Sequence, residues 1–161
     1  MRRLWLILPC MLIVLQACGF QLRGLGSLPE HLSNMRLLAD NLSSSQQRTL
    51  GQRLQRSGVT LRFDDESNPV TLRVAIKSLP ERKVADSAGS GQSIVRLSRQ
   101  LTFTVTDAAG ERLADNKIIE QKIDLELDDA NLLGTEGEKQ KALDNLDAAL
   151  FNSLMIQLRR L

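Results

Sequence analysis

The sequence predicts an α+β domain in which two helices pack on one face of a mostly antiparallel β-sheet. Two observations support this prediction. Several segments alternate apolar and polar residues with a period of two, and two other segments repeat apolar residues at three- and four-residue steps. The chain of 161 residues is long enough for one domain with a single core.

Period-two alternation marks the expected strands. In the clearest case Val70, Leu72 and Val74 share one face, and polar residues occupy the other. A turn-forming stretch at 106–111 follows one strand and precedes the next, which predicts a long hairpin. The first strand–helix–strand step is expected to supply one parallel pair. The expected strands are Met35–Asp40, Val59–Phe63, Val70–Leu79, Val95–Val105 and Ile119–Leu127.

Two helices are expected between and after these strands. The first is Ser43–Ser57, which starts at serines suited to the N-cap and stops before Gly58. The second begins at Glu138 and places leucines on one stripe, from Leu143 to Leu161. This stripe predicts packing against the sheet. A membrane-surface helix is the alternative, but its polar face would be rich in lysine and arginine.

The first residues predict a lipoprotein signal peptide, residues 1–17. Arg2 and Arg3 precede the apolar run Leu4–Leu15, which is too short to span a bilayer core. The run ends in leucine, glutamine and alanine before Cys18. This resembles the bacterial lipobox, which directs lipid attachment to the cysteine before cleavage. We therefore expect a single mature domain, residues 18–161, anchored through Cys18.

The surroundings of Cys18 agree with a lipid anchor. Cys10 lies in the leader, so Cys18 would be the only thiol of the mature domain. A free thiol is a liability in an oxidising compartment, and acylation removes it. Gly19 replaces the aspartate that usually retains Gram-negative lipoproteins in the inner membrane. The expected location is therefore the periplasmic side of the outer membrane.

The composition argues against several classes of function. Loss of Arg2 and Arg3 with the leader would leave 19 basic and 19 acidic residues, too balanced a charge to attract nucleic acid. The sequence has one histidine, His31, and no nucleophile motif. It also lacks a spaced set of metal ligands. We therefore expect no enzymatic activity and no cofactor.

Basic residues near one expected strand are the candidate binding site. Arg99 occupies a position that is otherwise apolar in its strand, and Arg96 lies close by. Arg82 and Lys83 join them if residues 70–84 pair with the strand that begins at Val95. Guanidinium groups suit phosphate because their planar fork bonds two oxygens at once. The alternative is a solvated sheet end whose charges discourage aggregation.

The segment from Cys18 to Gly24 resembles the opening of the LptE family, also called rare lipoprotein B. That family begins with cysteine, glycine, an aromatic residue, any residue, leucine and arginine, and this segment matches throughout. The order of the expected elements also fits. The resemblance implies two helices packed on a four-stranded sheet.

The resemblance also implies a function. LptE proteins sit inside the β-barrel LptD at the outer membrane as a plug and assembly partner, bind lipopolysaccharide and aid its delivery to the outer leaflet. Basic residues at one end of the sheet are implicated in contacting phosphates of the ligand. The local candidates are Arg82, Lys83, Arg96 and Arg99.

Two other functions remain open at this point. The chain would have the same anchor and size as an auxiliary lipoprotein subunit of another envelope lipid transporter. An anchored hydrolase of envelope glycans is the third possibility, with the single histidine and the missing nucleophile motif against it.

Overall fold

The computed structural model describes residues 27–62, 69–87, 92–128 and 132–161. The predicted signal peptide and Cys18 lie outside these residues, and the anchor stays a prediction. The described elements are, in chain order, the short 3-10 helix η2 (Glu30–Leu32), β1 (Asn34–Asp40), α2 (Ser44–Arg56), β2 (Thr60–Leu61), β3 (Val70–Ser78), β4 (Arg82–Ser87), β5 (Gln92–Thr106), β6 (Arg112–Asp128) and α3 (Leu132–Leu158).

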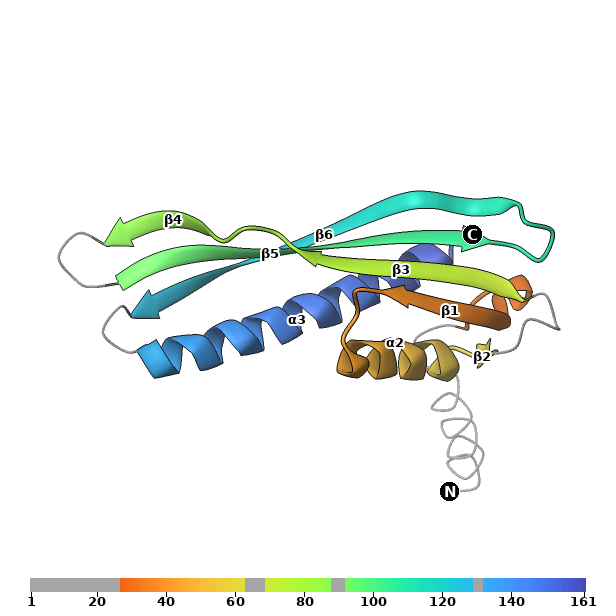
Figure 1. The fold of residues 1–161 in the computed structure, drawn as a ribbon, viewed down its shortest axis with the longest axis horizontal. Coiled ribbons are helices and arrows are strands. Elements are labelled where there is room, and N and C mark those ends of the chain that lie inside the picture. The colour runs from red at the N-terminus through yellow and green to blue at the C-terminus, as the bar shows by residue number, and fades with distance from the viewer. Residues whose placement is uncertain (1–26, 63–68, 88–91, 129–131) are drawn as a thin grey trace, which may run out of the picture.

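The predicted α+β class is confirmed. Both helices lie on the same side of a curled, mixed sheet (Figure 1). Strand β1 pairs in parallel with β2 and β3, and the other three pairings are antiparallel. The sheet contains six strands rather than four. The expected strand Val59–Phe63 is present only as the two-residue β2. Strand β4 is not among the expected strands, because residues 82–85 are all exposed and show no burial alternation.

Strand β5 pairs with three other strands of the sheet. Along one edge it pairs with β6, which confirms the predicted long hairpin. On its other edge β3 pairs with residues 99–106, and β4 pairs with residues 92–96. The two strands thus follow one another along β5, interrupted at residues 79–81. Pro80 lies in this interruption, where a missing backbone N–H breaks no ladder.

The helix boundaries follow from local chemistry. Ser43 caps α2 in a capping box with Gln46, and Gly58 follows the helix with a φ of +89°. Gly51 is buried next to Leu61, and a Cβ there would lie 3.4 Å from Leu61 Cδ1, at the short end of ordinary van der Waals contact. The predicted start of α3 at Glu138 is wrong, because the helix begins at Leu132. Residues 132–137 are not predicted as helix because they include Gly134 and Gly137, and glycine disfavours helix.

Side chains between the sheet and the helices form the main core. Phe103 of β5 and Phe151 of α3 are almost fully buried there. The leucine stripe of α3 is also buried from Leu146 to Leu158, which confirms packing against the sheet. A second, smaller cluster joins Leu97 of β5 to the first half of α3. The charged Arg99 lies between the two clusters on the inward face of β5.

Candidate functional site

The four predicted basic residues do not form one cluster. Arg82 and Arg96 are direct neighbours across β4 and β5, and share the outer face of the sheet, away from the helices. Lys83 pairs in register with Val95 and falls on the opposite face of β4. Arg99 points inward, where it forms an ion pair with Asp147 of α3. Residues that the sequence groups together therefore lie in two different environments, on opposite faces of the sheet.

Arg82 and Arg96 line a groove on the outer face of the sheet, which we call the basic groove. It forms at residues 79–81, between the end of β3 and the start of β4 along β5. At this point the Leu79 N–H donates to the Ser98 carbonyl at 3.0 Å. The groove encloses about 340 Å³. Its lining residues are Leu79, Pro80, Arg82, Arg96, Ser98, Glu120 and Lys122.

Arg96 is held in place by a carboxylate on the neighbouring strand. Its Nε and Nη2 donate to the two carboxylate oxygens of Asp124, at 2.6 and 2.7 Å. This hydrogen bonding holds the pKa of Asp124 below its usual value, with a smaller contribution from the charge of Lys122. The same pairing raises the pKa of Arg96, which stays charged. The fork orients Arg96 along the groove wall.

Lys122 is the groove residue that sequence reasoning missed. It lies on β6 directly opposite Ser98, and its side chain is exposed. Among the described residues, neither Lys122 nor Arg82 forms an ion pair. The lining of the groove therefore contains three cationic side chains and one carboxylate, Glu120. A second carboxylate, Asp124, lies beside the groove on Arg96. The alternation of β6 assigns Lys122 to the outer face, but only the register with β5 brings it to Arg96.

The titration of Asp124 tests this geometry. We expect a pKa below the ordinary aspartate value when the carboxyl resonance is followed by NMR. Because the folded-state pKa is lowered, the contribution of the pair to stability is present at neutral pH and is lost as the pH falls through that pKa. Arg96→Gln should raise the Asp124 pKa, and Lys122→Gln should raise it less. An unchanged pKa in Arg96→Gln would contradict the pairing.

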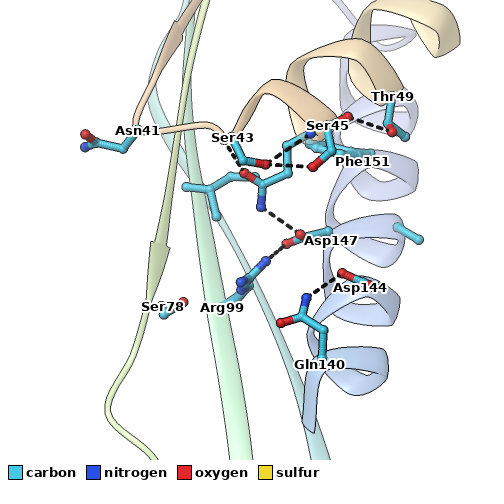
Figure 2. Close-up of a pocket in the computed structure, with 13 residues that line it drawn as sticks. Asn41, Ser43, Ser45, Thr49, Ser78, Arg99, Gln140, Asp144, Asp147 and Phe151 are labelled. Atoms are coloured by element: carbon cyan, nitrogen blue, oxygen red, sulfur yellow. Dashed lines mark hydrogen bonds and ion pairs between the residues drawn. The ribbon is translucent and has the colours of Figure 1, made fainter. Parts of the chain in front are cut away.

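Arg99 and Asp147 form a polar cluster on the helix side of the sheet. Their side chains are only 14% and 11% exposed. Asp147 also accepts a hydrogen bond of 2.7 Å from the amide of Gln46, so β5, α2 and α3 meet at this carboxylate (Figure 2). Strand alternation places this cluster on the opposite face from the basic groove.

Other types of site find little support in the described part of the chain. No group of three or more His, Cys, Asp and Glu side chains there is arranged to hold a metal ion. His31 is exposed in the middle of η2. No described helix combines the length and the apolar character that crossing a membrane requires.

The fold is similar to those of bacterial lipoproteins of known structure. An uncharacterized lipoprotein B from Nitrosomonas europaea matches with a TM-score of 0.65 and 19% identity, covering 88% of each chain. The rare lipoprotein B from Shewanella oneidensis matches with a TM-score of 0.64 and 15% identity, over 77% of this chain and 91% of that one. A minor lipoprotein from Acinetobacter baumannii gives 0.58 and 18%, over 82% and 91%.

These likenesses show that the chain has the fold of the rare lipoprotein B proteins. No protein-family model matches the sequence, and no curated protein matches it either.

Proposed function

We propose that the chain is an outer-membrane lipoprotein that partners and plugs the β-barrel LptD, binds lipopolysaccharide and aids its assembly into the outer leaflet. The observation that carries the ligand part of this proposal is the basic groove. The opening from Cys18 to Gly24 and the shared fold support the rest. The proposed role is binding and assembly without catalysis.

The chemistry of the groove suits phosphate groups. Arg82 and Lys122 are exposed and lie on either side of Arg96, whose orientation Asp124 fixes. Charge-assisted hydrogen bonds to phosphate oxygens are about twice as strong as neutral ones. Because basic and acidic residues nearly balance over the chain, affinity for an anionic glycolipid depends on such local placement.

The expected lipid anchor and the open sheet face agree with the proposed location and partner. A diacylglyceryl group and an N-acyl chain on Cys18 would give the two signals that stable anchoring requires. The outer face of the sheet is not covered by either helix (Figure 1). Along β5 this face carries polar residues from Arg96 to Thr106, which suits the polar interior of a large β-barrel.

Copurification tests the proposed partner. The full-length chain, tagged at its C-terminus, is expressed in a Gram-negative host that attaches lipid to lipoproteins. Its complexes are then extracted from the membranes in mild detergent. We expect a large outer-membrane β-barrel in equal amount. A stable complex with inner-membrane transporter subunits would instead favour the auxiliary-lipoprotein alternative. The unlipidated Cys18→Ala chain, which should leave the membrane fraction when the barrel is absent, is the control for anchoring.

A further inference from the structure

A polar cavity lies on the helix side of the sheet, around the Arg99–Asp147 pair (Figure 2). It encloses about 580 Å³, a volume within the range of small-ligand sites. Four elements contribute to it, namely the start of α2, the middle of α3 and the adjoining parts of β3 and β5. Its lining residues are Asn41, Ser43, Ser45, Gln46, Thr49, Ile76, Ser78, Arg99, Gln140, Asp144, Asp147, Ala148 and Phe151.

A charged pair is unusual at this position in the core. Leu97 and Leu101 flank Arg99 on the inward face of β5, and an apolar side chain there would join the two hydrophobic clusters. Buried ion pairs often contribute less to stability than apolar residues of the same size. In addition, the Nε of Arg99 is buried and has no hydrogen-bond partner among the described residues. This donor is left for an acceptor that the described residues do not supply.

The lining excludes several classes of ligand. Asp147 neutralises Arg99, and Asp144 adds a second carboxylate, so an anion would be repelled. Ile76, Ala148 and Phe151 are the apolar members of a largely polar lining, which does not suit an apolar ligand. No metal-binding group of side chains occurs in the described residues.

We propose that this cavity binds an uncharged, hydroxyl-rich ligand of the size of a sugar ring. Each sugar hydroxyl can both donate and accept a hydrogen bond, and the lining offers both kinds of partner. In the complex the Arg99 guanidinium turns toward the ligand, so that its Nε, which is buried without a partner in the structure, donates to one ring hydroxyl. Asp144 accepts from another, and Gln140, which now donates to Asp144 at 3.0 Å, turns to the ligand or stays on the carboxylate. Ser43 and Ser45 present hydroxyls from the start of α2.

This inference is independent of the proposed function. The cavity and the basic groove lie on opposite faces of the sheet, and the cavity is proposed to bind an uncharged ligand whereas the groove binds an anionic one. A test of sugar binding in the cavity can therefore give a positive result even if phosphate does not bind in the groove. Phosphate binding in the groove is likewise independent of sugar binding in the cavity.

Nitrogen–proton correlation NMR on the mature domain tests the proposal, with glucose and N-acetylglucosamine as probes and inorganic phosphate as the contrast. We expect both sugars to shift the Arg99 Nε–H signal and the backbone amides around residues 43–49 and 140–151. Phosphate should shift signals of Arg82 and Lys122 instead. Asp144 is exposed, so its replacement should not disturb the fold. Asp144→Ala should weaken sugar binding by about tenfold through the loss of a charge-assisted hydrogen bond.

A paired variant separates binding from folding. Arg99→Met with Asp147→Leu replaces the ion pair by apolar side chains and should abolish the sugar-induced shifts in a folded domain. Arg73→Gln with Asp40→Asn removes an exposed ion pair elsewhere in the sheet and should leave sugar binding unchanged. Absence of any shift in the cavity residues at saturating sugar, or undiminished binding by the folded Arg99→Met, Asp147→Leu variant, would overturn the proposal.

Discussion

Replacing Asp147 by leucine is expected to lower the free energy of unfolding by about 3 kcal/mol, because it leaves the Arg99 guanidinium buried without its counter-charge. The Arg99 side chain is 14% exposed, so water replaces little of the lost interaction. Gln46 loses its acceptor in the same variant. Urea unfolding, followed by circular dichroism, measures the change.

The double variant Arg99→Met, Asp147→Leu should recover most of this loss and lie within about 1 kcal/mol of the wild type. The exposed pair Arg73 and Asp40, which are 60% and 50% exposed, provides the matched control. Asp40→Leu should cost no more than about 1 kcal/mol, as surface ion pairs generally do. If Asp147→Leu proves as harmless as Asp40→Leu, the Arg99–Asp147 pair does not hold the three elements together as described.

Reversing the charges of the basic groove is expected to have the largest effect on the proposed ligand. Arg82→Glu with Lys122→Glu should weaken lipopolysaccharide binding about a hundredfold, since two charge-assisted hydrogen bonds of about 1.5 kcal/mol each are lost. Both side chains are exposed, so the melting temperature should change little. Binding is measured with the purified domain and lipopolysaccharide at constant ionic strength.

The control variant carries the same change of charge away from the groove. Arg48→Glu on α2 with Lys117→Glu on β6 alters two exposed residues outside the groove lining. We expect at most a small loss of affinity from the change in net charge. Equal losses in both variants would mean that overall charge governs binding, and the groove would then lose its role as the phosphate site.

Much of the fold could be predicted because its strands bury one face. The alternation of Val70, Leu72 and Val74 identified β3 and its inward side, and the structure confirms that all three are buried. Strand β4 gave no such signal, because residues 82–85 are all exposed. It is a strand through its pairing with β5, which depends on residues far along the chain.

The candidate site could be predicted only in part. The out-of-pattern position of Arg99 marked it as unusual, and the structure accounts for it through Asp147, a residue 48 positions away. Lys122 carried no distinguishing signal in its own segment. Its place in the basic groove results from the pairing of β6 with β5, opposite Ser98.

The class of fold, the two amphipathic helices and the inward side of the main strands follow from the amino-acid sequence alone, because they depend on local periodicity and on burial of apolar side chains. The faces on which the basic residues lie, and their partners, depend on strand pairing and helix packing. Arg96 and Arg99 lie three residues apart on one strand, and the side chains of a strand alternate. One of them therefore joins Arg82 on the open face of the sheet, and the other is buried against α3.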